Sequence, residues 1–213
     1  MPMECSVRFP NESSPFRFDA HKAVQAAGVL LREEPFHKMN YMKLIKLMYI
    51  AEREALKAHG RMITGDRVVA MQRGPVLSSV LDLINGTHIG VEAWDRHIER
   101  ERYHAMLKSN PGVNLLSRFE IELLQDVAKQ YRNNDEWEMV EITHKFEEWK
   151  KNKPVGSSCN DVSLRDILEG VGIADPTKVL QEAVQQARFN DFFSRHGACS
   201  KETPSPSPSQ VAV

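Results

Sequence analysis

The sequence predicts a mainly α-helical fold, in which one compact helical domain contains a small β element. Apolar residues recur at helical spacing through most of the chain, and capping residues, Gly or Pro bracket these segments. Runs of β-branched residues are short. With 213 residues, 41% hydrophobic and 27% charged, the chain has an ordinary globular composition and enough length to bury its own core.

Two helices are predicted to follow a polar lead-in at residues 1–18. Asp19 can cap the first helix, and Pro35 closes it. Asn40 can cap the second helix, YMKLIKLMYIAEREALKAH, which stops at Gly60, a residue suited to the left-handed conformation after a helix. Because apolar side chains cover well over half of the circumference of this second helix, we predict that it lies at the centre of the domain.

The narrow polar strip of the second helix carries Lys43, Lys46, Arg53 and Lys57, and Ile50 is expected to point outward in the same strip. One interpretation is that the lysine stems cover the edge of the core while their charges reach water. The alternative is a basic-rimmed apolar spot that receives an acidic partner protein.

A short extended segment and another helix are predicted next. Residues 66–73 contain β-branched side chains and follow a turn, so we expect short strands there. Pro75 suits the first position of a helix, because its missing N–H has no partner at that position anyway. Apolar residues at helical spacing then continue to Gly86, and we predict a helix that begins at Pro75.

Residues 91–109 allow two interpretations. Their composition favours a helix. However, apolar and polar side chains also alternate in two short runs, which favours a β-hairpin at residues 91–108.

The clearest helix start is the segment LSRFEIE. The Ser117 hydroxyl can accept a hydrogen bond from the Glu120 N–H, while the Glu120 carboxylate can reach back to the Ser117 N–H. Leu116 and Ile121 occupy the flanking apolar positions of this capping box. After this helix, Asn134 is predicted to cap another.

The end of the chain completes the predicted domain organisation. Ser163 can cap a short helix that ends at Gly170, so we assign residues 19–173 to the main domain. A helical extension at 174–195 is expected to follow. The Pro/Ser-rich tail at 196–213 is expected to be disordered.

Charge and composition limit the classes of function. A formal net charge of −1 argues against nucleic acid as the main partner. No apolar run reaches the length of a membrane span and the N-terminal segment lacks an apolar signal core, so we expect a cytoplasmic protein without a membrane partner. Three widely spaced cysteines argue against a disulfide framework and for a reducing compartment.

No catalytic motif stands out in the sequence. We find no phosphate-binding loop, Gly-rich nucleotide fingerprint or GxSxG element. The eight histidines are scattered, and none lies four residues from another. We therefore expect no enzyme activity, no catalytic residues, no cofactor and no metal site. A metal-dependent enzyme that uses His97, His104 or His144 is the alternative.

Several segments occur in one fixed order: KLIKLMYIAE, an extended segment ending in RGPV, LSRFEIELLQDVAKQY, and EITHKFEEW. In this order they resemble the Panacea domain, the family of SocA-like antitoxins and phage-associated proteins. The resemblance covers roughly residues 19–170. It implies a compact, mainly helical domain without enzyme activity that acts as the antitoxin of a toxin–antitoxin pair. The SocA type is similar to a proteolytic adaptor that presents its bound toxin to the ClpXP protease.

The resemblance also separates structural positions from possible contacts. Lys43, Lys46 and Arg73 are expected to contact a partner, because nothing in the core requires their charge. Ile50 and Arg53 belong to the same expected contact set. The positions that match the family motifs, and that we expect to be structural, are Leu44, Leu47, Tyr49, Gly74, Pro75, Val76, Ser117, Glu120, His144 and Trp149.

The expected partners are therefore a cognate toxin and, for an adaptor, ClpXP. A tail that ends in Val211-Ala212-Val213 is compatible with a degradation signal. A DNA-binding regulator of its own operon is the alternative of a different class, although the chain shows no convincing helix-turn-helix.

Overall fold

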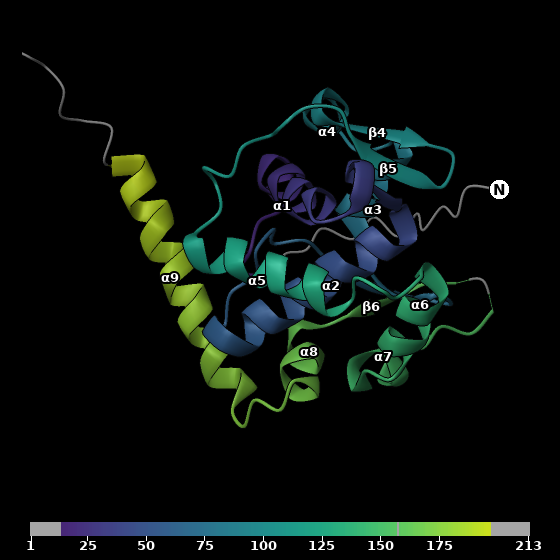
Figure 1. Ribbon diagram of the computed structural model, residues 1–213. Coiled ribbons are helices and arrows are strands. Elements are labelled where there is room, and N and C mark those ends of the chain that lie inside the picture. Colours follow the sequence, from purple (N-terminus) through teal and green to yellow (C-terminus); the bar gives the residue numbers. More distant parts are fainter. Residues whose placement is uncertain (1–13, 157, 197–213) are drawn as a thin grey trace, which may run out of the picture.

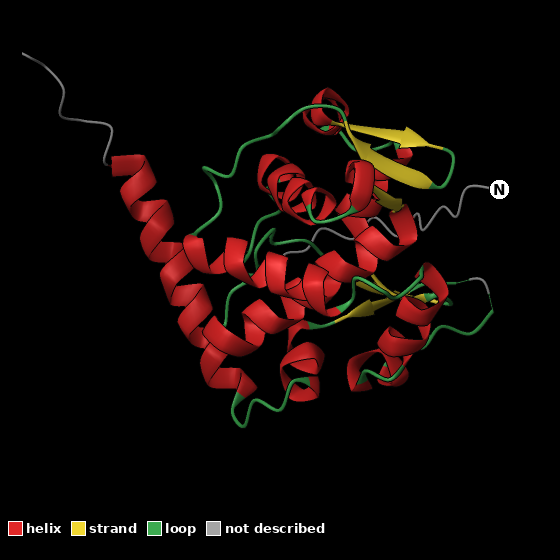
Figure 2. Ribbon diagram, in the orientation of Figure 1, coloured by secondary structure: helices red, strands yellow, loops and turns green. Residues whose placement is uncertain are grey.

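The computed structural model describes residues 14–156 and 158–196 (Figure 1). Within these residues the fold is mainly helical, as predicted, and its strands form two small antiparallel sheets (Figure 2). In chain order the elements are α1 (Ala20–Arg32), the 3-10 turn η1 (Pro35–His37), β1 (Lys38–Asn40), α2 (Tyr41–His59), β2 (Val68–Met71), β3 (Gly74–Leu77), α3 (Ser78–Asn85), α4 (Val91–His97), β4 (Ile98–Glu101), β5 (His104–Leu107), α5 (Arg118–Gln130), α6 (Glu136–His144), α7 (Glu147–Lys151), β6 (Asn160–Val162), α8 (Leu164–Gly170) and α9 (Pro176–His196).

Helix α2 lies at the centre of the fold, which confirms the prediction from its apolar surface. At its start, Asn40 Oδ1 accepts a hydrogen bond from the Met42 N–H at 2.9 Å, and at its end Gly60 is left-handed (φ 63°). Leu44 and Leu47 are completely buried. Helices α1, α3, α5, α6 and α8 and strands β1, β3 and β5 all contact α2. In the view of Figure 2 the two sheets lie above and below it.

The two sheets join segments that are distant in the sequence. The order of the first is β1-β5-β4, and Asn40 in β1 lies opposite His104 in β5. The order of the second is β3-β2-β6, and Val68 in β2 lies opposite Val162 in β6. The later part of the chain thus completes the sheet that contains the β2–β3 hairpin.

The prediction that Pro75 begins a helix is wrong. Gly74 to Leu77 form strand β3, in which Pro75 lies opposite Ala70 of β2. Because β3 is at the edge of its sheet, the missing N–H of Pro75 removes no hydrogen bond from the ladder. The apolar residues that looked like the first turn of a helix belong to a buried strand.

A carboxylate from another segment determines where α3 begins. Its N-cap residue, Leu77, offers no side-chain bond. Instead, the buried Asp66 side chain accepts from the N–H groups of Ser79 at 3.0 Å and Val80 at 2.9 Å. These two groups have no partner inside the helix, so Asp66 replaces the missing cap and places the first turn at Ser78.

The structure decides between the two interpretations of residues 91–109 and corrects the predicted cap of α6. Residues 91–109 contain both alternatives, because α4 ends at His97 and the β4–β5 hairpin follows directly. The hairpin prediction is therefore right only for residues 98–107. Helix α6 is capped by Asp135 rather than Asn134, since Asp135 Oδ1 accepts from the Glu138 N–H at 2.8 Å and completes a capping box.

Other local predictions are confirmed. Asp19 caps α1, Ser163 caps α8, and Ser117 with Glu120 forms the capping box at the start of α5. Pro176 begins α9, as expected for the C-terminal helix.

Two expectations concern the cysteines and the termini. The spacing of the cysteines argued against a disulfide framework, but Cys159 is disulfide-bonded. The predicted lead-in up to residue 13 and the tail from 197 to 213, with its possible degradation signal, lie outside the described residues. No described helix is long and apolar enough to cross a membrane.

A second buried carboxylate fixes the loop before β2. Glu52 on α2 is 1% exposed and accepts hydrogen bonds from the N–H groups of Ile63 and Thr64 and from the Thr64 hydroxyl. Burial raises the pKa of Glu52 to about 7 and that of Asp66 to about 6, although their hydrogen bonds act in the opposite direction. Both carboxyl groups therefore change charge inside the folded domain near neutral pH.

We expect the free energy of unfolding to fall as the pH rises from 5 to 7. In the folded chain Glu52 keeps its proton up to about pH 7, whereas in the unfolded chain its pKa is 4.5. The folded state therefore gains stability from this proton below pH 4.5, and this gain is lost as the pH rises through 7. Each such group contributes a slope of about 1.4 kcal/mol per pH unit at most. Urea denaturation of the full chain at intervals of half a pH unit measures this slope. The variant Glu52→Gln should have a shallower slope, and an unchanged slope would contradict the assignment.

Candidate functional site

The turn between β2 and β3 is held by side chains from three helices. From α7, the indole Nε1–H of Trp149 donates a hydrogen bond to the carbonyl of Met71 at 3.0 Å. From α2, Lys46 Nζ donates to the carbonyl of Pro75 at 2.7 Å. The two bonds fix the carbonyl groups on either side of the turn.

A third bond comes from His144 at the end of α6. Its Nε2 lies 3.1 Å from the carbonyl of Gln72, and its ring stacks on Trp149 with centroids 3.8 Å apart. Burial is the largest influence on His144 and lowers its pKa, which favours the neutral ring. Since a carbonyl can only accept, the neutral tautomer is the one protonated at Nε2. The sequence predicted a structural role for both His144 and Trp149, but it did not predict their shared hold on the turn.

Gly74 lets the turn approach the helices closely. Its φ of 95° lies in the left-handed region that favours glycine. A Cβ atom there would lie 2.7 Å from Thr143 Oγ1 and 2.8 Å from Lys46 Nζ, closer than atoms pack. The residue is therefore required both for its backbone conformation and for the space it leaves.

A buried ionic cluster holds α7 in place beside the turn. Glu148, which is 1% exposed, accepts hydrogen bonds at Oε1 from the Tyr49 hydroxyl at 2.7 Å and from Arg53 Nε at 2.8 Å. The same guanidinium donates to the carbonyl of Gly170 at 2.9 Å. Because Glu148 precedes Trp149 in the chain, this cluster also positions the indole that binds the turn.

The predicted basic contact strip on α2 is largely buried. Lys46 is 1% exposed and Ile50 3%, because the surrounding helices and the turn cover them. Lys43 and Arg53 are ion-paired with carboxylates, at 2.8 Å in each case. The premise that the core needs none of these charges is wrong, and the expectation that Ile50 points outward is wrong as well. Of the strip, Lys57 keeps an exposed side chain.

Arg73 differs from these residues because it is exposed at the tip of the turn. Its guanidinium lies 5.2 Å from the ring centroid of Trp137 on α6, within the range of a cation–π contact. The Trp137 side chain is itself 54% exposed. The turn thus presents a cation and a large aromatic ring next to each other on the surface.

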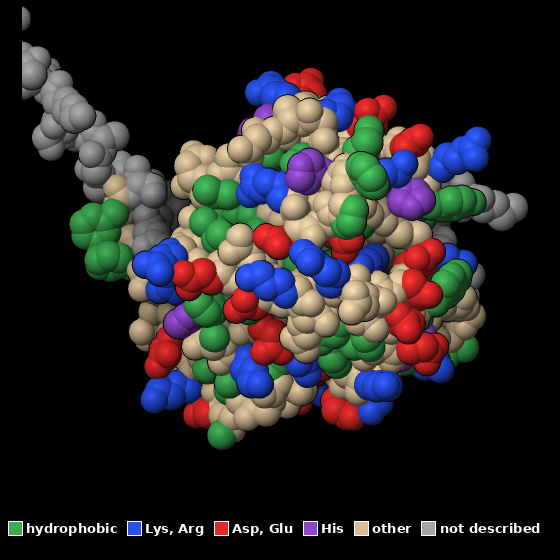
Figure 3. Space-filling model, in the orientation of Figure 1, with side chains coloured by type: hydrophobic (Ala, Val, Ile, Leu, Met, Phe, Trp, Pro, Cys, Tyr) green, Lys and Arg blue, Asp and Glu red, His purple; other side chains and the backbone are tan. Residues whose placement is uncertain are grey.

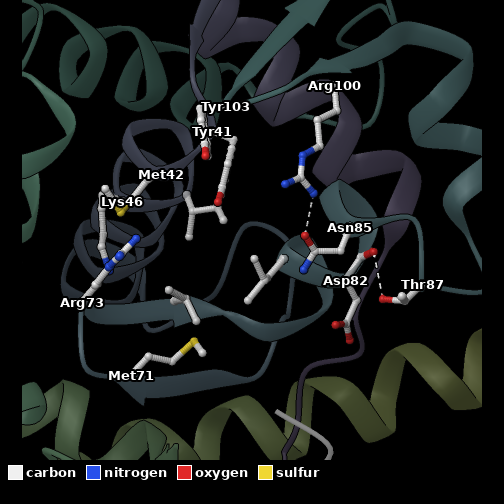
Figure 4. Close-up of a pocket in the computed structure, with 13 residues that line it drawn as sticks. Tyr41, Met42, Lys46, Met71, Arg73, Asp82, Asn85, Thr87, Arg100 and Tyr103 are labelled. Atoms are coloured by element: carbon white, nitrogen blue, oxygen red, sulfur yellow. Dashed lines mark hydrogen bonds between the residues drawn. The ribbon is translucent and has the colours of Figure 1, made fainter. Parts of the chain in front are cut away.

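A cleft of about 650 Å³ opens beside the turn (Figure 4). Its walls come from α2, the β2–β3 hairpin, α3 and the β4–β5 hairpin. Arg73 and Arg100 lie on different sides of this space, with Tyr41 and Tyr103 near them. Arg100 could not be found from sequence motifs, because only the folding of the hairpin brings it to the cleft.

The described residues contain no group of three or more His, Cys, Asp or Glu side chains that could hold a metal ion. His97 does not pair with His104 across the hairpin but lies 2.9 Å from the Ser109 hydroxyl. His144 is engaged with the β2–β3 turn. No arrangement of these three histidines supports the metal-enzyme alternative.

The motif residues that meet at the turn are those by which the sequence resembled the Panacea domain. The family model described as antitoxin SocA-like, Panacea domain, matches residues 44–150, which is half of the chain. The chain belongs to this antitoxin-like family. Comparisons with curated proteins and with solved structures give no significant match. For this Panacea domain, the match spans most of α2, the turn, α6 and most of α7.

Substituting Gly74 tests the close approach of the turn. Gly74→Ala combines a positive φ with a clash, so we expect a loss of about 3 kcal/mol or more in the free energy of unfolding. Gly86→Ala is the matched control, since Gly86 has a φ of 77° but nothing within 4 Å of the added Cβ. It should cost only about 1 kcal/mol. Denaturation curves that give equal losses for the two variants would contradict the role of close packing.

The buried Lys46 should give a pH dependence opposite to that of Glu52. Burial lowers its pKa from 10.5 to about 7, so between these values the unfolded chain binds one more proton than the folded chain. Stability from this residue therefore rises with pH above 7. In Lys46→Met this rise is absent. The free energy of unfolding of the variant should therefore fall progressively further below that of the wild type between pH 7 and 9.5. Parallel pH profiles in urea denaturation would show that Lys46 stays charged in the fold.

Proposed function

We propose that this chain is the antitoxin of a toxin–antitoxin pair and neutralises its toxin by direct protein contact at the β2–β3 turn. The observation that carries the proposal is the convergence of the motif residues Lys46, His144 and Trp149 on three carbonyls of one turn. This anchored turn carries Arg73 at its tip, next to the exposed Trp137 of α6. Arg and Trp are common among residues that dominate binding energy in protein interfaces.

The proposal also includes the compartment in which the protein works and the way in which it acts on the toxin. We propose that the protein works in the cytoplasm, where its toxin would act, and that it works by binding rather than by catalysis. Of the contact residues expected from the sequence, we propose that Arg73 binds the toxin. The other members support the fold from inside: Lys43, Lys46, Ile50 and Arg53.

Two finer alternatives concern the fate of the bound toxin. The toxin is either blocked by occlusion or, if the chain is an adaptor, delivered to ClpXP for degradation. The half-life of the toxin in cells with and without ClpX separates these outcomes, because occlusion leaves the half-life unchanged.

A DNA-binding role has less support than toxin binding. Figure 3 shows acidic and basic side chains interspersed over most of the face drawn, with acidic groups gathered near α6. A surface that follows the phosphate backbone carries a basic stripe instead. Salt-dependent binding to the promoter fragment of its own operon would favour this role.

Co-expression with the product of the adjacent reading frame tests the antitoxin function. The wild-type chain should restore growth to cells that express this toxin. Arg73→Ala should lose most of the protection without losing stability, because Arg73 is exposed and holds no buried partner.

Arg118→Ala is the matched control. Arg118 is an exposed arginine on α5 that pairs with Glu122 on its own helix, and the variant should protect fully. If the wild-type chain gives no protection against this or any neighbouring toxic product, the antitoxin function itself is wrong. Full protection by Arg73→Ala would remove only the role of the turn.

A further inference from the structure

We propose that the cleft beside the turn receives an acidic side chain of the toxin, which is seated between Arg73 and Arg100. This inference rests on the proposed antitoxin function and names the chemistry that the site recognises. The acidic side chain enters as an anchor from a folded or extended segment of the partner protein.

Arg100 is already oriented for such a contact. Its Nη1 donates to the side-chain oxygen of Asn85 at 2.7 Å, and its guanidinium lies 4.8 Å from the centroid of the Tyr41 ring (Figure 4). Its Nε donates to the carbonyl of Arg102 at 3.1 Å. A guanidinium that is fixed by a ring and by two acceptors loses little rotamer entropy when it binds a carboxylate.

Arg73 faces Arg100 across the cleft from a separate element. It follows the carbonyls fixed by Trp149 and His144, and its guanidinium is supported on the ring of Trp137. Because the backbone on both sides of the tip is anchored, the distance between the two arginines is set by the fold. Each guanidinium offers a planar pair of N–H donors that matches the two oxygens of a carboxylate.

The space between the arginines fits a side chain with an apolar stem. Ile45, Val76 and Leu81 line the cleft together with the two arginines. Its volume of about 650 Å³ exceeds that of one carboxylate and leaves room for neighbouring residues. The apolar residues in the wall can pack against the stem of such a side chain while its carboxylate meets the arginines.

The charges around the cleft favour an anion. Lys46 adds a third nitrogen to the wall, and the low pKa given to it by burial is raised again when a negative charge approaches. Asp82 contributes an acidic side chain to the lining, and burial raises its pKa. In Figure 4 the carboxylate of Asp82 points away from Arg100, so it leaves the space between the arginines free for another anion.

The surroundings favour a protein over a small free anion. Tyr103 at the rim of the cleft is 68% exposed, and Trp137 is exposed on the other side of Arg73. These rings extend the contact surface beyond the volume that a small anion fills. Exposed Trp, Tyr and Arg around a recessed spot are the composition of the centre of a protein interface.

Charge reversal tests the proposal with the full-length chain and the purified toxin of the adjacent reading frame. Arg73→Glu and Arg100→Glu should each weaken binding on the order of tenfold or more, whereas the control Arg118→Glu should bind as the wild type does. Because Arg100 also supports the hairpin, Arg100→Gln is included, and thermal melting checks that each variant is folded. Arg100→Gln should weaken binding less than Arg100→Glu if charge is what matters.

A compensating change in the toxin identifies the anchor. Each Asp and Glu of the toxin is changed to Arg, and we expect one of these variants to restore protection by Arg73→Glu or Arg100→Glu. If the wild-type chain protects but neither reversal weakens binding, the cleft proposal is overturned and the antitoxin function stands. If the wild-type chain gives no protection, the function fails and the cleft proposal fails with it.

A small-molecule role of the cleft has a separate readout. Thermal shift of the chain alone is measured with citrate and with AMP. Each is added at about 1 mM, the upper end of typical KM values. Stabilisation that is lost in both arginine variants, while toxin binding is unchanged, would assign the cleft to a free anion and overturn the proposal.

Discussion

The hold on the β2–β3 turn is the constraint on which the rest of the domain depends. Trp149, His144 and Lys46 come from three different helices, and each ends on a carbonyl of the same short turn. A hydrogen bond of this kind contributes about 1 kcal/mol net, but leaving a buried carbonyl without a partner costs about 1 to 3 kcal/mol. The placement of the turn and the packing of the three helices therefore stabilise each other.

Buried carboxylates fix further parts of the domain. The Tyr49–Glu148–Arg53 cluster is costly to bury but fixes α7 against α2. Glu52 and Asp66 similarly replace backbone partners that the loop before β2 and the start of α3 lack. In each case a buried polar side chain fixes the position of a helix or loop that apolar packing alone would not specify. The free energy of unfolding then depends on the pH.

Much of the fold could be predicted from local signals, because the helix caps at Asn40, Ser117 and Ser163 act within a few residues of the chain. The predictions failed where a distant residue decided the outcome. Pro75 looked like a helix start, but pairing with β2 and capping by Asp66 moved the start to Ser78. Lys46 looked exposed because no sequence pattern shows that a carbonyl from residue 75 will come to meet it.

The candidate site combines both kinds of information. The motif order located the turn and its family, yet Arg100 enters the site only through the β4–β5 hairpin, and Trp137 through the placement of α6. Neither contact follows from sequence spacing. Of the contact residues expected from the sequence, Arg73 is the exposed one, and its guanidinium lies over the ring of Trp137.

The inward and outward sides of the turn have different physical roles that depend on each other. Pro75, two residues after Arg73, is bound from inside by Lys46, and Gln72, one residue before it, is bound by His144. The residues on either side of Arg73 and Gly74 are thus each held by a hydrogen bond from a helix side chain, so the backbone of the tip is anchored in the free chain. A site that needs no ordering on association loses little entropy and can discriminate among partners by charge position. In the proposed antitoxin function, the anchored turn would therefore be a source of specificity for the toxin.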